Sequence, residues 1–157
     1  MAAFAHVAKH AEPAGNRGPS IALRIHPLLP LLVLGPGVIA QQLTDTGIAP
    51  IPNCSPWFCG VARHGGQMVP FFDFALWAGL ERLDERVAAM ISVTAGSHVL
   101  GLLASQSPIV LPADRVVTPW NGTAEALTGH AAGDMAYYFD PSTWLAEIAL
   151  SIAAEFS

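Results

Sequence analysis

The sequence predicts an all-β protein with minor α content, built as a β-barrel or paired β-barrels and closed by one C-terminal helix. Short apolar runs recur along the chain between turns, with 14 Gly and 13 Pro among 157 residues. Hydrophobic residues make up 52% of the chain and charged residues 12%, which is too apolar for a disordered protein. The length is that of about one domain with a sizeable core.

The first predicted strands follow a long N-terminal segment of polar and small residues. Residues 1–20 show no sustained period and are predicted to be a flexible tail, so the domain is predicted over residues 21–157. Residues 21–25 alternate in polarity and predict a half-buried strand. The apolar run Leu31–Leu34 ends in a Gly-Pro-Gly turn, and Val38–Leu43 is either a strand end or one helical turn.

The middle of the chain holds a strand that runs into a short helix. Residues 68–74 predict the strand, and Pro70 places it at an edge or a bulge because proline cannot donate a ladder hydrogen bond. Asp73 is positioned to cap the helix predicted over residues 75–80. The charged residues 81–86 then predict an exposed connection.

A hairpin and two further short strands follow. Residues 87–93 and His98–Ala104 predict the hairpin, joined by a Thr-Ala-Gly-Ser turn. Ile109–Leu111 and residues 135–139 predict the short strands. A strand, an aspartate and a helix thus occur in succession twice in the chain, which suggests equivalent corners of two similar subdomains.

The C-terminal helix is predicted to begin at Ser142 as its N-cap. Trp144, Ile148 and Ile152 give it an apolar stripe that faces a core. Trp57, by contrast, follows a proline in a loop, where a role at an interface is a rival to core packing because tryptophan is enriched at binding hot spots.

Charge and hydropathy exclude several classes of partner. The formal net charge is −5 and no basic run exists, so neither nucleic-acid binding nor a polybasic membrane-surface patch is expected. The most apolar run, residues 27–40, is interrupted by prolines and is about 14 residues long, shorter than the ~20 that span a bilayer. We therefore expect no direct membrane insertion. Two cysteines in a chain of this size fit a cytoplasmic protein.

No catalytic, cofactor-binding or metal-binding pattern is evident in the sequence. The serines lack the G-x-S-x-G pattern, and the glycines fit neither G-x-G-x-x-G nor a P-loop. The six histidines are scattered, and the cysteines do not form two pairs with zinc spacing. We therefore expect a protein that is not an enzyme and needs no cofactor. A small-molecule-binding barrel is a weaker alternative, because the apolar strands lack convergent polar groups.

Cys54 and Cys59 leave one further alternative open. They are five residues apart, whereas a redox pair prefers C-x-x-C at a helix start. The preferred interpretation is that Cys54 and Cys59 are two ordinary thiols in an apolar loop. A thiol-based redox sensor that uses this pair is the alternative function.

The residues around the central strand, taken in order, resemble the CheW-like family of bacterial chemosensory adaptors. The residues that carry the resemblance are Pro52-Asn53, Pro56, Trp57, Gly60-Val61, Gly66 and Val69-Pro70-Phe71-Phe72-Asp73-Phe74. Downstream residues continue it: His98-Val99-Leu100-Gly101-Leu102-Leu103, Pro112-Ala113-Asp114-Arg115-Val116, Leu127-Thr128-Gly129 and Asp140 with its helix.

This resemblance implies two intertwined, five-stranded SH3-like barrels around a shared apolar core, plus a C-terminal helix. It implies an adaptor that couples the cytoplasmic tip of methyl-accepting chemoreceptors to the regulatory domain of a CheA-type histidine kinase. Such proteins are cytoplasmic, associate with membrane chemoreceptor arrays, and have no catalysis and no cofactor. A related branch controls type IV pilus motility, and the Pro-Trp-Phe-Cys-Gly-Val segment favours that branch slightly.

The chain departs from the family pattern where partner contacts are expected. Gly65 replaces the arginine before the motif glycine, and Arg63 occupies the usual asparagine position. Gln41 or Gln42 replaces an acidic residue of an early Val-x-Glu segment. The residues that the resemblance and the loop composition assign to partner binding are Val38, Gln41, Gln42, Trp57, Arg63, His64, Gly65 and Gly66.

Overall fold

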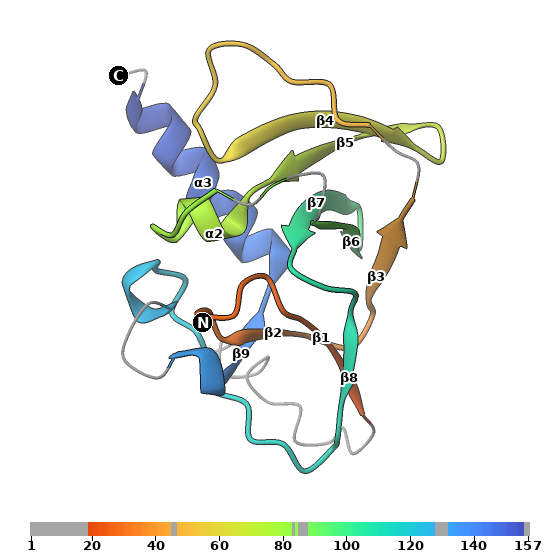
Figure 1. The fold of residues 1–157 in the computed structure, drawn as a ribbon, viewed down its shortest axis with the longest axis vertical. Helices are drawn as coiled ribbons and strands as arrows, with labels where there is room; N and C mark the ends of the chain where they lie inside the picture. The colour runs from red at the N-terminus through yellow and green to blue at the C-terminus, as the bar shows by residue number, and fades with distance from the viewer. Residues whose placement is uncertain (1–18, 45–46, 83, 85–87, 128–131, 156–157) are drawn as a thin grey trace.

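The fold is known from a computed structural model that describes residues 19–44, 47–82, 84, 88–127 and 132–155. The predicted tail lies outside the described residues, except for Pro19 and Ser20. The described residues form two sheets and few helices, which confirms the mostly β fold class. In Figure 1 the second sheet lies above the first, and α3 (Pro141–Glu155) begins between them and runs to the upper left beside the second sheet.

The first sheet is assembled from both ends of the described chain. Its strands, in spatial order, are β8 (Ile109–Leu111), β1 (Ser20–Leu23), β2 (Leu31–Leu34) and β9 (Ala136–Phe139). β2 and β9 are parallel, and an isolated bridge from Thr118 to Tyr137 extends the sheet beyond β9. Two short 3-10 helices, η1 (Glu125–Leu127) and η2 (Ala132–Asp134), precede β9. Within the described part of the chain this sheet therefore has four strands and a bridge, whereas five strands were predicted.

The second sheet has the predicted five strands and comes from one continuous part of the chain. Its spatial order is β3 (Val38–Leu43), β6 (Ala89–Ala95), β7 (His98–Ala104), β5 (Gln67–Phe72) and β4 (Phe58–His64). Leu43 of one edge strand and Ala62 of the other belong to the same buried cluster. The sheet therefore curls until its two edges share an interior, as in a small SH3-like barrel.

β4 is the strand that the sequence did not predict. A bulge between Phe58 and Gly60 shifts its register and breaks the alternation of polarity. Gly60 has φ +135°, and a Cβ atom there would overlap the carbonyl of Ala49. Because Ala49 and Val61 exchange two backbone hydrogen bonds of 2.8 and 3.0 Å, the glycine keeps this extra bridge possible.

The expectation that Pro70 lies at an edge or a bulge is wrong for the sheet as a whole. β5 lies between β7 and β4, and Pro70 pairs in regular register with Val61. The backbone of Val61 bonds to Ala49 on its other side, so Val61 requires no amide donor from Pro70. The parallel pairing of β5 with β7 starts only at Phe71, so the proline disrupts no ladder hydrogen bond there either.

A shared apolar core joins the two sheets. It takes buried side chains from the first sheet, such as Leu23 and Leu32, and from the second, such as Leu100 and Leu102. α3 follows β9 of the first sheet but packs against β6 and β7 of the second. This crossing is how the two halves intertwine, as the family resemblance implies.

Aromatic side chains form the centre of this core. Trp144 of α3 is 1% exposed and packs edge-on against Phe72 and Trp77, with ring centroids 5.2 and 5.6 Å apart. Phe74, from α2 (Phe74–Trp77), and Phe139, from β9, contact the same indole at 5.2 and 6.1 Å. The predicted stripe of α3 is confirmed at Trp144 and Ile148, while Ile152 lies outside the described side chains.

The two aspartates that follow strands both cap helices. Asp73 accepts a hydrogen bond from the amide of Leu76 at 3.0 Å, which confirms its predicted role. At α3 the cap is Asp140 rather than the predicted Ser142. Its carboxylate accepts from the amide of Ser142 at 3.1 Å and from the hydroxyl of Thr143 at 2.9 Å. The Ser142 hydroxyl instead lies 3.2 Å from Nδ1 of His98.

A methyl group at Gly101 is expected to destabilise the fold, because a Cβ atom there would overlap the ring of Phe71. Gly101→Ala should lower the free energy of unfolding by about 1–3 kcal/mol. Urea denaturation measures the change. Gly35→Ala is the control, since no atom lies within 4 Å of its Cβ position. Equal stability of the two variants would contradict the close contact between Gly101 and Phe71.

Removal of the α3 cap provides a second test of the fold. Asp140→Ala should cost about 1 kcal/mol of stability, because it leaves the amide of Ser142 and the hydroxyl of Thr143 without their partner. Ser142→Ala removes a hydroxyl that does not cap the helix and should cost less. Thermal denaturation of both variants ranks the two positions. The reverse order would restore Ser142 as the cap.

Candidate functional site

The eight residues predicted to bind partners lie in three places around the second sheet. Val38, Gln41 and Gln42 are on β3, at one edge of the sheet. Arg63, His64, Gly65 and Gly66 form the end of β4 and the turn into β5, at the opposite edge. Trp57 precedes the start of β4. Since a strand rises about 3.3 Å per residue, Trp57 and the turn lie roughly 25 Å apart along β4.

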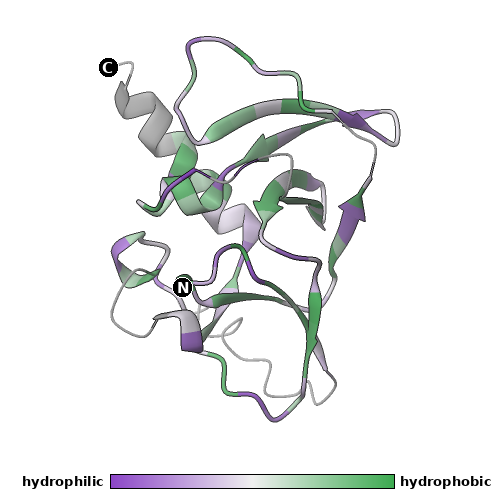
Figure 2. Ribbon diagram, in the orientation of Figure 1, coloured by the Kyte–Doolittle hydropathy of each residue, from purple (hydrophilic) through white to green (hydrophobic). Residues whose placement is uncertain are grey.

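The turn between β4 and β5 is built from two glycines in the left-handed region. Gly65 has φ +60° and Gly66 has φ +80°, the conformation of a two-residue turn that matches the twist of its strands. Both are exposed, and no atom lies within 4 Å of either Cβ position. The hairpin projects at the upper right of Figure 1, and Figure 2 shows hydrophilic residues around its turn. A partner backbone can therefore approach this turn closely.

Arg63 differs from the other arginines that the structure describes. Arg24 donates to the carbonyl of Leu29 at 2.7 Å, Arg82 to that of Pro56 at 2.7 Å, and Arg115 to that of Asp134 at 3.0 Å. Burial lowers the pKa of Arg24. Arg63 is exposed and, within the part of the chain that the structure describes, makes no hydrogen bond or ion pair. Its guanidinium is available to another molecule.

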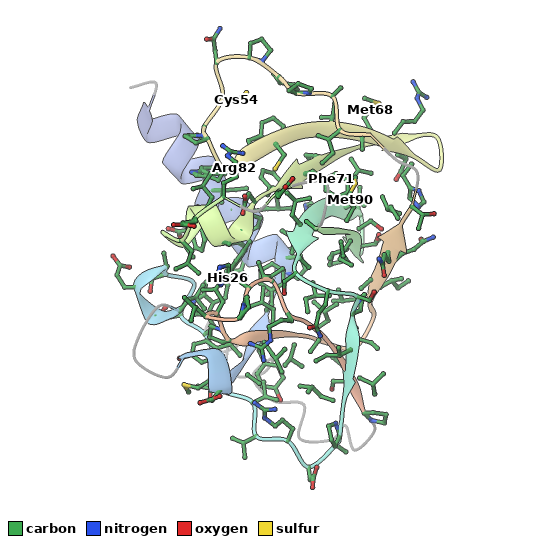
Figure 3. The ribbon with its side chains drawn as sticks, in the orientation of Figure 1. His26, Cys54, Met68, Phe71, Arg82 and Met90 are labelled. Atoms are coloured by element: carbon green, nitrogen blue, oxygen red, sulfur yellow. The ribbon has the colours of Figure 1, made fainter. Side chains whose placement is uncertain are left out.

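An apolar strip leads from Arg63 back to the core. Met68 lies directly opposite Arg63 in the hairpin and is 54% exposed. Val61 and Pro70 form the next cross-strand pair on the same face and are half-buried. Figure 3 shows Met68 on the outer side of the hairpin, away from Phe71 and Met90. Met68 was not among the predicted partner-binding residues, although its position two residues after the turn could have indicated that it lies beside Arg63.

The β3 edge is uncharged and partly apolar. Gln41 and Gln42 are exposed, and Ile39 is 64% exposed, whereas Val38 is half-buried against the shared core. β3 pairs on one side with β6, where the Ser92 hydroxyl reaches the carbonyl of Gln41 at 3.5 Å. Such an edge, with neither charge nor proline, is suited to contact with another chain.

Trp57 is placed closer to the core than its loop position indicated. It is half-buried, its ring lies 6.3 Å from that of Phe72, and its carbonyl accepts a hydrogen bond of 2.8 Å from the amide of Asp73. These contacts attach the loop before β4 to α2. The structure therefore separates Trp57 both in distance and in environment from the hairpin turn.

The remaining candidate chemistry is dispersed. Cys54 is exposed, whereas Cys59 is 7% exposed in the interior of the second sheet, and the structure joins neither in a disulfide. Among the described residues, no three His, Cys, Asp or Glu side chains are grouped closely enough to hold a metal ion. No helix of the described chain is long and apolar enough to cross a membrane.

A cleft that the sequence did not indicate lies where the two sheets meet. Its volume is about 270 Å³, and its walls include Val38, Trp120, Tyr138 and Asp140. The carboxylate of Asp140 already caps α3, and the indole nitrogen of Trp120 donates to the carbonyl of Thr123 at 2.9 Å. Because these two groups are engaged within the chain, the cleft offers few free polar groups to a ligand.

These features define a class of protein: a two-sheet β protein with a shared core, whose candidate binding groups lie on a hairpin turn and a strand edge. The model of the CheW-like domain matches residues 38–127, more than half of the chain. The chain therefore belongs to the CheW-like domain family. The match spans β3 to β8 and includes the whole second sheet.

Comparison with solved structures supports the same fold. The chain is similar to the crystal structure of the scaffolding protein TtCheW from Thermoanaerobacter tengcongensis, with a TM-score of 0.52 and 17% sequence identity. That similarity covers 68% of this chain and 74% of TtCheW. A comparison with curated protein sequences found no match. The predicted family and the predicted fold class are thus confirmed.

Charge reversal at Arg63 should leave the fold intact, because the guanidinium has no partner within the described chain. We expect Arg63→Glu to change the free energy of unfolding by less than about 0.5 kcal/mol. Chemical denaturation measures this value. Arg24→Glu, which removes a partly buried guanidinium and its hydrogen bonds to the carbonyls of Leu29 and Gly133, is the comparison and should cost more. A large loss of stability in Arg63→Glu would mean that the side chain has a structural role.

Proposed function

We propose that this protein is a non-catalytic adaptor that couples chemoreceptors to a CheA-type histidine kinase. The observation that carries the proposal is the CheW-like family match over residues 38–127, which includes both edges of the second sheet. The similarity to a scaffolding protein supports the fold on which such an adaptor depends. Residues 21–157 form the proposed adaptor domain, and its site of action is the cytoplasmic side of a membrane receptor array.

Two surfaces are the proposed contacts for two partners. The first is the β3 edge with Val38, Gln41 and Gln42, and the second is the hairpin turn with Arg63, His64, Gly65 and Gly66. They lie on separate elements, the strand β3 and the turn between β4 and β5, which supports contacts with two different partners. The proposed partners are the regulatory domain of the kinase and the cytoplasmic tip of a methyl-accepting receptor. Control of type IV pili remains a prediction.

No observation favours the redox alternative. Cys59 packs with Leu43, Ala62 and Val69 in the interior of the second sheet, while Cys54 is in the exposed loop before β4. A thiol enclosed in an apolar interior is a poor nucleophile, because burial disfavours the thiolate. The adaptor is therefore the single function that we propose.

Separate binding measurements test the adaptor function. The unaltered chain is titrated by calorimetry with the kinase regulatory domain of its own organism and, independently, with a receptor signalling fragment. Binding to both fragments, and formation of a ternary complex when all three are mixed, supports the adaptor. Binding to the kinase domain alone would show that receptor coupling has been lost. If neither fragment binds, the proposal is wrong.

A charge on the β3 edge is expected to impair one of these contacts. Gln41→Arg places a bulky cation on an exposed, uncharged edge and should weaken binding of one fragment by roughly tenfold or more. Gln106→Arg adds the same charge at another exposed position and serves as the control. Equal affinities of both variants for both fragments would exclude the β3 edge as a contact.

A further inference from the structure

We infer that the β4–β5 hairpin is a charge-selective contact for a protein surface that presents a carboxylate beside an apolar side chain. The inference rests on the proposed adaptor function and specifies the chemistry of one partner. We call Val61, Arg63, Met68 and Pro70 the tip patch. They form two successive cross-strand pairs on one face of the hairpin.

The first step of the inference is the unused charge of Arg63. Three of the four arginines that the structure describes donate to backbone carbonyls of their own chain. Arg63 is exposed and has no hydrogen bond or ion pair within the described residues. A guanidinium presents five donors in a planar fork that matches the two oxygens of a carboxylate. An Asp or Glu side chain is thus its complementary partner group.

The second step is the apolar surface beside this charge. Met68 is directly opposite Arg63 and is 54% exposed, which leaves a flexible thioether at the surface. Opposed residues of an antiparallel pair have Cβ atoms about 5 Å apart, so the aliphatic part of Arg63 can lie along Met68. Arginine and methionine are both enriched at protein interfaces, where an apolar centre strengthens a neighbouring charged pair.

The third step is access. The Gly65–Gly66 turn carries no Cβ atom, and the space around both Cβ positions is open. A bulky turn would hold a partner at a distance from Arg63. With two glycines a partner backbone can come close enough for the carboxylate to reach the guanidinium. Val61 and Pro70 then extend the contact toward the shared core.

The opposite face of the hairpin provides an internal control. Gln67 pairs with His64 and points to the face opposite to Met68, because successive strand residues alternate. Arg63→Gln and Gln67→Glu each lower the formal net charge by one, from −5 to −6. They differ only in whether the change falls on the tip patch. General electrostatic repulsion of an acidic partner would affect both variants alike.

The experiment measures the affinity of the full chain and its variants for the kinase regulatory domain and for the receptor fragment, each at low and high salt. For one of the two fragments, Arg63→Gln should raise Kd by roughly tenfold or more and reduce its salt dependence. Arg63→Lys should recover part of the affinity, because it restores the charge without the fork. Gln67→Glu should change Kd by less than about threefold.

Charge exchange identifies the partner group. Exposed Asp and Glu residues of the affected fragment are changed one at a time to Arg, and each variant is titrated with Arg63→Glu. Recovery of binding at one position supports the inference. Unchanged affinity of Arg63→Gln, or equal losses in Arg63→Gln and Gln67→Glu, overturns it while the adaptor function stands. Failure of the unaltered chain to bind either fragment overturns both proposals.

Discussion

The structure depends on the packing of one indole between two sheets. Trp144 reaches the core from α3, which follows the first sheet. It contacts Phe72 of β5, in the second sheet, and Phe74 of α2, which follows β5. Buried aromatic pairs of this kind contribute beyond the area that they remove from water. Among the described side chains, the indole nitrogen of Trp144 is the buried polar atom without a hydrogen-bond partner, so the indole is held in this core by packing. The cluster fixes the relative position of the two sheets, and therefore of every surface that they carry.

The glycines of the family motif have a related physical role. Gly101 leaves room for the ring of Phe71, and Gly60 lets Ala49 bridge to Val61. Both close approaches fix β5 and β4 against their neighbours, and the hairpin that carries Arg63 extends from these two strands. The exposed contact group is thereby held on rigid strands, which limits the entropy lost on binding.

Much of the fold was predictable from the sequence because its strands are short and are separated by turns with Gly and Pro. The bounds of β2, β7 and β8 follow directly from apolar runs between turns. β4 could not be predicted, since its bulge disrupts the period of two that identifies a strand. The candidate site could be predicted from the sequence only in part. The motif located the hairpin turn, but whether Arg63 is free or paired depends on distant groups, and the exposure of Met68 and Ile39 depends on how the sheet curls.

The order of strands along the chain has a consequence for folding. β2 pairs with β9, and all strands of the second sheet lie between these two strands in the sequence. The first sheet is therefore complete only after the chain of the second sheet has been made. Pairings between segments so distant in sequence are slow to form, because a long loop must be closed before the contact stabilises it. During synthesis, β1 and β2 leave the ribosome early, and their apolar faces stay uncovered until β9 and α3 have been synthesised. Expression of this protein in its native form is therefore sensitive to anything that delays or removes its last two elements.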